Sequence, residues 1–477
     1  MTEPFYLIYR NQYIRQLIRN LVCQDVSIRV DEEYLEENHQ YLALFHNKHK
    51  IDYNIFICFK GNAGDYLDIN NSNRDLINVV ELSINDDDFD LSEIHDGVRK
   101  LSLTTENNDT SVTGKLPPSI TWLRLTDDIH DDHQPSYTQQ ILSNLPSSLQ
   151  KLELNIPRES ITIPCIMPES LTDILTDGLL YYDVMKWFVV PSNRVYKSCE
   201  IYIDSVESFE WLLANKWIPK VRITRSGSNM MAGRYQLPSH VTNVEVYGII
   251  EDQSFFPQTL EALSCGYGTP ISHLAHLKVL RIGGDYPINL ERGVLPSTLQ
   301  ELRLDYNHPL ESLCANVLPL SLTELYLGVF NQPLNAFVLP SKLKTLYMQN
   351  FRQPILPPNS LPVSLINLSI GGFNGSFDQY QPLDNLKKQQ VNSLNPSLAT
   401  LLTNVKKLYL LVFNKGGNGD PSGCLYNTSI RSLYLEFICE KALYPNTFPL
   451  TLKYLTLVNA NLESDDIIPS GCTLLNK

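Results

Sequence analysis

Apolar and polar residues alternate over a short stretch of the chain, LPLSLTELYLGVFNQPL at residues 318–334. Successive side chains of an extended strand point to opposite faces. Leu325 and Leu327 therefore fall on one face, and Glu324 and Tyr326 fall on the other. The pattern predicts a short strand that buries one leucine edge and leaves the opposite edge to solvent.

The same phrase returns along the chain at steps close to 22 residues. From Leu302 through Leu325 and Leu346 to Leu368 the steps are 23, 21 and 22 residues. Further copies are LPPSITWLRL (116–125), LPSSLQKLEL (145–154), LPSHVTNVEV (237–246), FPQTLEALSC (256–265), HLAHLKVLRI (273–282), LLTNVKKLYL (401–410), YNTSIRSLYL (426–435) and FPLTLKYLTL (448–457). One such unit cannot bury its leucines alone, so the repeat predicts a solenoid. We expect roughly 17 stacked strands in a parallel sheet on the order of 80 Å long.

The residues after each strand disfavour an α-helix on the outer side of the solenoid. Pro333 lacks the amide that a helix interior needs, and the side chain of Asn331 suits a buried turn in which it satisfies backbone groups. The hydroxyl of Ser321 is expected to bond a nearby backbone amide before the strand. We therefore expect a curved parallel β-sheet on the concave side and a mostly extended or 3-10 convex side.

Two stretches depart from this repeat pattern. ESFEWLLANKW (207–217) carries an apolar stripe at helical spacing and predicts a helix. Leu368 and Leu408 lie nearly two periods apart, so we expect one repeat between them with a polar or helical insertion. Weaker strand patterns extend the array toward the N-terminus at NVVELSI (78–84), VRKLSL (98–103), SLTDIL (170–175), SCEIYI (198–203) and PKVRIT (219–224).

Residues 1–70 lack the repeat phrase and predict a small, mainly α-helical cap module. Apolar residues recur at helical spacing over 5–22, with Arg10, Arg15 and Arg19 expected to face solvent. A second helix is expected over 31–47, followed by a strand at 53–59. The module either covers the open edge of the first repeat, as solenoids require, or docks an adaptor. Degenerate repeats with insertions are assigned to 71–235 and regular repeats to 236–477.

Charge and cysteine content narrow the classes of partner. The 477 residues carry a formal net charge of −14, which argues against nucleic acid because phosphate binding needs clustered Lys and Arg. The N-terminus lacks the pattern of a signal peptide, and no apolar run is long enough to span a bilayer, so we expect no membrane association. Nine scattered cysteines without a C-x-x-C pair indicate reduced, mostly buried thiols and a cytoplasmic protein.

Residues 318–334 resemble the string L-P-x-S-L-x-x-L-x-L-G-x-x-F-N-x-P-L of FNIP repeats, a 22-residue subclass of leucine-rich repeats. Phe330 to Leu334 form the name-giving stretch, and close variants begin at Tyr306 and Phe351. The helix predicted over 5–22 also resembles the aromatic and basic helix that begins many proteins of this family. The resemblance implies a leucine-rich-repeat solenoid that acts as a non-enzymatic binding scaffold in the cytosol.

Some members of that family carry an F-box before the repeats, which implies a substrate-recognition subunit of a ubiquitin ligase. Its usual opening, L-P-x-E-I, is not visible in this sequence. We keep as an alternative that residues 1–60 dock a ligase adaptor.

The outward strand positions are the candidate binding site. Tyrosine provides a large contact area with a polar tip, which protein interfaces favour. Stacked in register, the residues between the strand leucines are expected to form one row along the concave face. The candidates for partner binding are Arg281, Arg303, Glu324, Tyr326, Tyr347, Tyr409, Tyr434 and Tyr454. The partner is expected to be a protein; its identity and the oligomeric state are left open.

Other polar clusters are interpreted as solvated loops. TDDIHDDH (126–133) and HNKH (46–49) combine residues that can bind a divalent cation, but the first is expected to lie in a long loop and the second lacks a third ligand. GGNGDPSG (416–423) and KGNAGD (60–65) lack the spacing of a phosphate-binding loop and are expected to be loops. NDDDFD (85–90) is expected to be a turn. No nucleophile, metal site or cofactor motif is recognised, so we expect no enzyme activity.

Overall fold

The computed structural model describes residues 10–84, 88–105, 111–127, 137–158, 160–176, 181–231, 233–284, 290–306, 313–377, 381–413 and 423–476. The chain divides into two compact units, Met1–Arg222 (unit 1) and Ile223–Lys477 (unit 2). The domain boundaries expected at residues 70 and 235 stay predictions.

Unit 1 combines a helical N-terminal part with a parallel sheet. Its helices are α2 (Gln12–Val22), α3 (Glu32–Leu42), α4 (Asn47–Asp52), α5 (Ala63–Asp68), α6 (Asn71–Arg74), α7 (Tyr137–Leu142), α8 (Tyr182–Met185) and α9 (Val206–Ala214), with the 3-10 turn η1 (Leu91–Glu93). Its strands are β1 (Ser27–Val30), β2 (Phe56–Asn62), β3 (Val79–Ile84), β4 (Asp88–Asp90), β5 (Lys100–Thr105), β6 (Ser111–Thr113), β7 (Trp122–Asp127), β8 (Lys151–Asn155), β9 (Cys165–Ile166), β10 (Asp173–Thr176), β11 (Phe188–Val189) and β12 (Glu200–Ile203). The sheet has the order β1-β2-β3-β5-β7-β8-β10.

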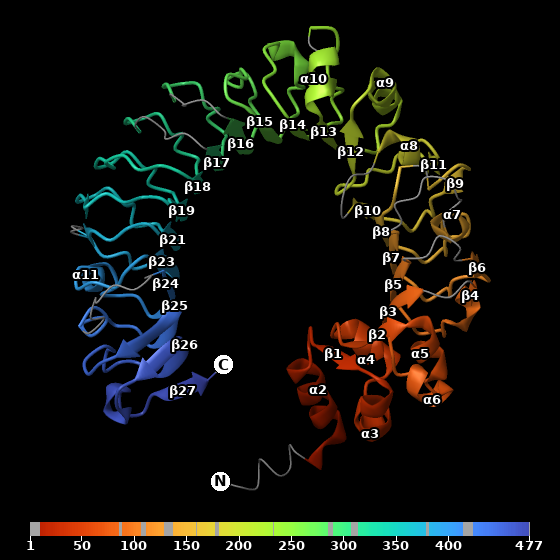
Figure 1. Cartoon of the computed structure of the whole chain (residues 1–477), viewed down its shortest axis with the longest axis horizontal. Helices are drawn as coiled ribbons and strands as arrows, with labels where there is room; N and C mark the ends of the chain where they lie inside the picture. The colour runs from red at the N-terminus through yellow and green to blue at the C-terminus, as the bar shows by residue number, and fades with distance from the viewer. Residues whose placement is uncertain are drawn as a thin grey trace. The chain divides into compact units, whose positions relative to one another are not determined.

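Unit 2 is built from short parallel strands joined by loops. Strand β13 (Lys220–Ile223) ends at the first residue of unit 2. The elements that follow it are α10 (Arg225–Met231), β14 (Asn243–Val246), η2 (Gln253–Phe255), β15 (Ala262–Gly266), β16 (Val279–Gly284), β17 (Glu301–Tyr306), β18 (Glu324–Leu327), β19 (Thr345–Tyr347), β20 (Ile355–Leu356), β21 (Asn367–Ile370), β22 (Ser376–Phe377), β23 (Lys388–Val391), α11 (Leu398–Leu401), β24 (Lys407–Val412), β25 (Ser432–Leu443), β26 (Tyr454–Leu462), η3 (Asp465–Ile467) and β27 (Thr473–Asn476). Its sheet runs in the order β14-β15-β16-β17-β18-β19-β21-β23-β24-β25-β26-β27. Within unit 2 these strands line the concave side, and the loops lie on the convex side (Figure 1).

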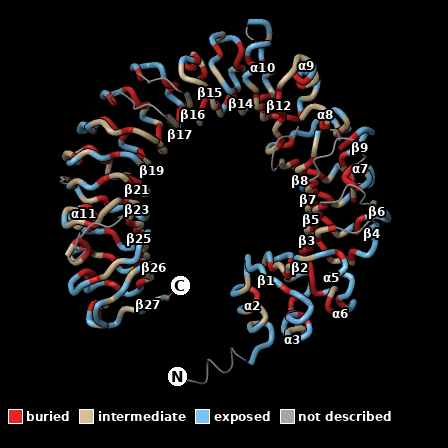
Figure 2. Tube along the Cα trace, viewed as in Figure 1, coloured by how far each residue is buried: buried red, intermediate tan, exposed pale blue. Residues whose placement is uncertain are grey.

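The strand leucines form the core of each repeat. Leu302, Leu325, Leu346 and Leu368 pair with one another across β17, β18, β19 and β21, and all four are buried. Buried and partly exposed residues alternate along β17, β18 and β19, and buried segments follow the strands of unit 2 (Figure 2). The predicted solenoid with a parallel sheet is therefore confirmed, as are the degenerate strands, which correspond to β3, β5, β10, β12 and β13.

The convex side of unit 2 is held by a stack of phenylalanines. The rings of Phe330 and Phe351 lie 6.2 Å apart between centroids at an interplanar angle of 9°, and those of Phe351 and Phe373 lie 5.9 Å apart. Asn331 accepts a hydrogen bond through Oδ1 from the backbone amide of Arg352, at 2.7 Å. The repeat spacing thus places one phenylalanine in each of these turns, and Asn331 binds the backbone of the next turn, as expected for an extended convex side.

The serine of the phrase binds differently from the prediction. The hydroxyl of Ser321 donates to the carbonyl oxygen of Leu299 in the preceding repeat, at 2.6 Å, and no amide is its partner among the described contacts. Ser364 donates in the same way to the carbonyl of Leu343. The correction has a simple cause, because the strand amides are already paired in the ladder while these loop carbonyls are free to accept.

The insertion between Leu368 and Leu408 contains a complete repeat. Its strand is β23, with sequence KQQV, and Gln389 takes the buried position that leucine holds in neighbouring repeats. The helical insertion is the single turn α11. The helix predicted over 207–217 is found as α9, with Phe209 and Leu212 buried.

The N-terminal module is mainly helical, and Arg10 and Arg15 are exposed as predicted, but much of the apolar face of α2 is exposed as well. In α2 the apolar residues Tyr13 and Val22 are 71% and 74% exposed, while Asn20 is buried. Arg19 bonds the Asn20 side chain, and its guanidinium lies 4.8 Å from the ring centroid of Phe45. The expectation that Arg19 faces solvent is wrong, because its flat guanidinium packs on an aromatic ring.

The rest of the module differs from the prediction in its boundaries. The helix predicted over 31–47 ends at Leu42, and α4 is a separate helix. The expected strand at 53–59 is found as β2, which pairs with β1, a strand that the pattern did not indicate. Lys50 is 3% exposed, and its Nζ donates to the carbonyl of Leu76 at 2.8 Å.

Candidate functional site

The concave surface of unit 2 consists of the partly exposed residues that alternate with the buried strand residues. On β18, Glu324 and Tyr326 are partly exposed while Leu325 and Leu327 are buried. The same alternation places Arg281, Arg303 and Tyr347 on this surface. The predicted outward positions are therefore confirmed, whereas their role in binding stays a prediction.

Four of the predicted residues occupy consecutive paired positions. Arg281 pairs with Arg303, Arg303 with Tyr326, and Tyr326 with Tyr347 across β16 to β19. The guanidinium of Arg303 lies 3.9 Å from the ring centroid of Tyr326, and the Tyr326 and Tyr347 rings are 6.0 Å apart. Together with Glu301 we call these residues the arginine–tyrosine cluster.

Hydrogen bonds to carboxylates fix the orientation of this cluster. Nε of Arg303 donates to Oε1 of Glu301 at 2.5 Å, and the Tyr326 hydroxyl donates to Oε2 of Glu324 at 2.9 Å. Burial, followed by the hydrogen bond to Glu324, raises the pKa of Tyr326. The phenol therefore stays neutral and remains a donor at physiological pH.

Lys388, Tyr409, Tyr434 and Glu436 form a second group, the tyrosine–lysine cluster. The rings of Tyr409 and Tyr434 are stacked, with centroids 4.4 Å apart and an interplanar angle of 11°. The ammonium of Lys388 lies 5.3 Å from the Tyr409 ring, and the Tyr409 hydroxyl donates to Oε2 of Glu436 at 2.7 Å. This hydrogen bond is the main cause that raises the pKa of Tyr409.

The two clusters lie in different rows, which corrects the expectation of a single row. Tyr409 pairs with Lys388, which pairs with Asn367. Tyr347 instead pairs with Ser369, and that row continues through Gln390 to Leu411. Relative to the alignment of the repeat phrase, the pairing of β23 with β24 is therefore displaced by two residues. Because side chains alternate with a period of two, such a shift keeps the same residues buried.

Tyr454 stands apart from both clusters. It pairs with Ser432 and with Thr473, whereas Tyr434 pairs with Thr456. Its side chain is exposed. It therefore lies on the concave surface one row earlier along the strands than Tyr434.

The other candidates from the sequence do not form a metal or phosphate site in the part of the chain that the structure describes. Most of TDDIHDDH, residues 128–133, lies outside the described residues, as do 416–422 of GGNGDPSG and 85–87 of NDDDFD. The rings of His46 and His49 are 5.4 Å apart, and the described residues contain no cluster of three or more potential ligands. The prediction of a loop at 60–65 is wrong, because residues 60–62 form the end of β2 and residues 63–65 form the start of α5.

The nine cysteines are all free thiols. Only Cys165, Cys199, Cys265 and Cys424 are buried, so the expectation that most are buried is wrong. Cys314 and Cys439 are exposed.

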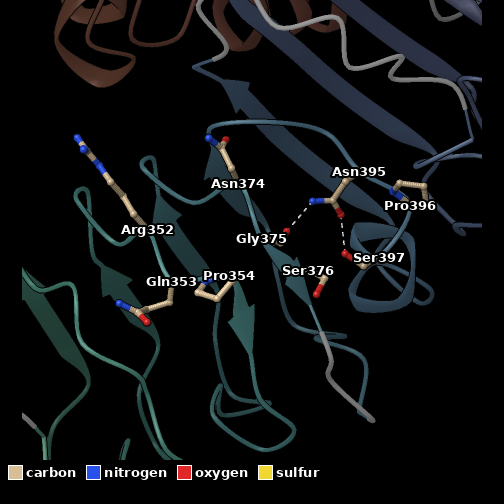
Figure 3. A pocket seen from close by; sticks show the side chains of 9 residues that line it. All are labelled: Arg352, Gln353, Pro354, Asn374, Gly375, Ser376, Asn395, Pro396 and Ser397. Carbon is tan, nitrogen blue, oxygen red and sulfur yellow. Dashed lines mark hydrogen bonds between the residues drawn. The ribbon is translucent and has the colours of Figure 1, made fainter.

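A hollow of about 570 Å³, lined mainly by polar residues, lies on unit 2 beside β22 and α11, and no sequence motif indicated it. Several of its polar groups bind one another: Nδ2 of Asn395 donates to the carbonyl of Gly375 at 2.8 Å, and the Ser397 hydroxyl donates to Oδ1 of Asn395 (Figure 3). The side chain of Arg352 points away from them (Figure 3). This arrangement holds the loops together and does not converge on one point.

A second hollow, of about 620 Å³, lies at the ends of β14, β15 and β16 beside α10. We call it the strand-end hollow. Arg225 and Asn229 of α10 and Tyr247, Ile249 and Tyr267 after the strands contribute to its walls. A signal was available in the sequence, because Gly248, Gly266 and Gly283 each follow a strand core in successive repeats, but the position of α10 was not predictable from it.

A comparison with models of protein families agrees with this architecture. The parallel sheet and the buried leucine ladder define a leucine-rich-repeat solenoid. A family model described as the FNIP repeat matches residues 306–351 and 330–373, so this segment consists of FNIP repeats.

Solved structures similar to this chain include CroV588, a circular leucine-rich-repeat protein, with a TM-score of 0.46 and 18% identity over 84% of this chain and 59% of that chain. TLR13 in a complex with ssRNA13 gives a TM-score of 0.45 and 14% identity over 84% of this chain and 81% of that chain. The chain therefore spans 59% of the length of the first of these structures. A comparison with curated protein sequences gave no match. Among the helices that the structure describes, none has the length and apolar character that crossing a bilayer requires.

Proposed function

We propose that the chain is a non-enzymatic scaffold that binds a protein partner on the concave surface of unit 2. The observation that carries the proposal is the pair of ordered aromatic clusters on an open sheet face. Both clusters are held by ring contacts, tilted in the first and stacked in the second, and by hydrogen bonds to Glu324 and Glu436. Side chains that are already ordered lose less conformational entropy when a partner binds.

Protein is the class of partner that this surface suits best. Tyr and Arg are the residues most enriched among those that dominate binding energy at protein interfaces. Arg303 forms an ion pair with Glu301, and the formal net charge of the chain is −14, whereas binding a phosphate backbone requires clustered positive charge. The free thiols support the cytoplasmic location that we propose with this function.

The test compares double variants of the full-length protein. Tyr326→Ala with Tyr347→Ala, and Tyr409→Ala with Tyr434→Ala, should each weaken binding of an affinity-purified partner by about tenfold or more. Tyr444→Ala is the matched control, because Tyr444 is exposed outside both clusters. Circular dichroism checks that each variant is folded. Unchanged recovery of the partner with both double variants would reject this surface.

A second candidate function is substrate recognition for a ubiquitin ligase, with residues 1–60 as the docking element. One observation favours a docking role: the apolar residues Tyr13, Ile18, Leu21 and Val22 of α2 are exposed. An amphipathic helix with an open apolar face can lie in a partner groove. Ile18→Asp with Leu21→Asp in the full chain should then abolish recovery of a ligase adaptor, and a wild-type chain that recovers none would exclude this function.

A further inference from the structure

The row that contains the arginine–tyrosine cluster continues to the strand-end hollow. Glu245 on β14 pairs with Ser264 on β15, which pairs with Arg281 on β16. Glu245 and Ser264 also contribute to the lining of the hollow. The hollow and the arginine–tyrosine cluster are therefore neighbouring parts of one surface within unit 2.

Backbone atoms form part of the hollow because glycine follows the strand core in three successive repeats. The amide of Gly266 donates to the carbonyl of Gly248 at 2.7 Å, and a Cβ on Gly266 would lie only 2.8 Å from that carbonyl oxygen. Gly266 pairs with Gly283 of the next strand. Side chains are thus absent where a ligand group can approach the sheet most closely.

The walls of the hollow combine apolar surface with one arginine, Arg225, and one glutamate, Glu245. Tyr247 and Ile249 are exposed although they lie beside the cavity. Arg225 is exposed at the rim, and its guanidinium makes no hydrogen bond or ion pair among the described residues. A volume of about 620 Å³ lies within the range of about 300–1,000 Å³ that holds compact organic ligands. It is ample for an aromatic side chain with its adjoining backbone.

Arg281, the next cation along the row, is only weakly neutralised. Oε1 of Glu301 lies 2.5 Å from Nε of Arg303 but 3.9 Å from the nearer guanidinium nitrogen of Arg281. The Arg281 side chain is 53% exposed. One carboxylate therefore serves two guanidinium groups, and Arg281 can accept a further carboxylate from a ligand.

We propose that the strand-end hollow and Arg281 together bind an extended segment of the partner protein, with an aromatic side chain in the hollow and an aspartate or glutamate two residues further on at Arg281. The inference rests on the proposed function and adds the chemistry of the bound segment. The bound segment is expected to be acidic and aromatic because Arg281, which is only weakly neutralised, lies beside an apolar cavity.

The spacing of the sheet sets the spacing in the peptide. Neighbouring strands are about 4.8 Å apart, and an extended chain advances about 3.3 Å per residue. The hollow centres on β14 and β15 and Arg281 lies on β16, so the step across the strands is roughly 7 Å, or about two residues. Residues two apart in an extended segment also face the same side, so both side chains can reach the sheet together.

The test selects random 12-residue peptides, displayed on phage, against the full-length protein. Peptides with an aromatic residue two positions before an acidic residue should be enriched. One enriched peptide is then labelled and its binding is measured by fluorescence anisotropy. Asn229→Trp, which fills the hollow from the exposed face of α10, and Arg281→Glu should each weaken binding by about tenfold or more.

Arg352→Glu is the matched control, because Arg352 is an exposed arginine on unit 2 that lines the other hollow. Replacing the acidic residue of the peptide by lysine should restore binding to Arg281→Glu, which a misfolded variant would not show. The inference is overturned if no aromatic and acidic spacing is enriched, or if Asn229→Trp and Arg281→Glu bind the peptide like the wild type. Partner binding that is lost in the tyrosine double variants but kept in these two overturns this inference alone and leaves the proposed function standing.

Discussion

The phenylalanine stack on the convex side of unit 2 can be tested by replacing its middle member. Phe351 is fully buried between Phe330 and Phe373. Removing a buried phenylalanine side chain to alanine costs about 3–5 kcal/mol. In Phe351→Leu most of the apolar volume is kept, and the loss comes from two aromatic contacts worth about 0.5–1.5 kcal/mol each. We therefore expect a destabilisation of about 1–3 kcal/mol.

The effect should be local, because a repeat interacts only with its neighbours. Amide hydrogen exchange measures this directly, since 1.4 kcal/mol corresponds to a tenfold change in protection. The amides of Phe351 and Arg352, which bond the Met348 carbonyl and the Asn331 side chain, should lose protection by roughly tenfold to a hundredfold. Exchange in β3 and β5 of unit 1 should stay unchanged.

Leu320→Ala provides the control, because Leu320 lies in the preceding repeat phrase and is 75% exposed. Its effect should remain within about 0.5 kcal/mol. The reasoning is refuted if Phe351→Leu changes exchange no more than Leu320→Ala does. It is also refuted if the loss of protection spreads evenly through both units.

Two further predictions follow from buried titratable groups. Burial lowers the pKa of Lys50 to about 8 from 10.5. Between these two pH values the unfolded chain binds a proton that the folded chain has released. The free energy of unfolding should therefore rise with pH from about 8 to 10.5, by on the order of 3 kcal/mol. Urea unfolding of Lys50→Met should lack this rise, and an equal rise in the variant would contradict the assignment. Burial also raises the pKa of Cys165 to about 11 and that of Cys265 to about 12, so a thiol reagent should modify the exposed Cys314 and Cys439 first; a single rate for all nine thiols would contradict this.

The repeat phrase was sufficient to predict the strands and their buried faces. Each copy places leucines at alternating positions, and a one-residue error would move all of them to the solvent side. This is why Leu325 and Leu327 are buried, and why Tyr326 lies beside Tyr347 and Tyr409 beside Tyr434, as the pattern indicated.

The register between β23 and β24 could not be predicted from the same pattern. A shift by two residues leaves the inward set unchanged, so the hydrophobic pattern carries no information about it. The strand KQQV adds to the ambiguity, because Gln389 replaces the leucine that marks the register elsewhere. The candidate binding residues that were expected to form one row therefore lie in two rows.

The orientation of α2 and the strand-end hollow were missed for a related reason. Helical periodicity shows that Ile18 and Leu21 share a face with the other apolar residues, but it does not show which face meets the protein. Packing decides which face is buried. In α2 the guanidinium of Arg19, on the polar side of the helix, packs on the ring of Phe45. In the same way, the glycines after the strands were visible, whereas the cavity depends on where α10 lies beside them.

The separation into two rows changes what a partner must do to contact both clusters. From Tyr347 on β19 to Tyr409 on β24 there are three strand steps, about 14 Å, and a shift of two residues, about 7 Å along the strands. The partner must therefore cross the sheet obliquely, because a path that stays in the row of Tyr347 meets Ser369 and Gln390 instead. Side chains this far apart act independently, so we expect the arginine–tyrosine cluster, with the strand-end hollow beside it, to bind a partner segment without the tyrosine–lysine cluster.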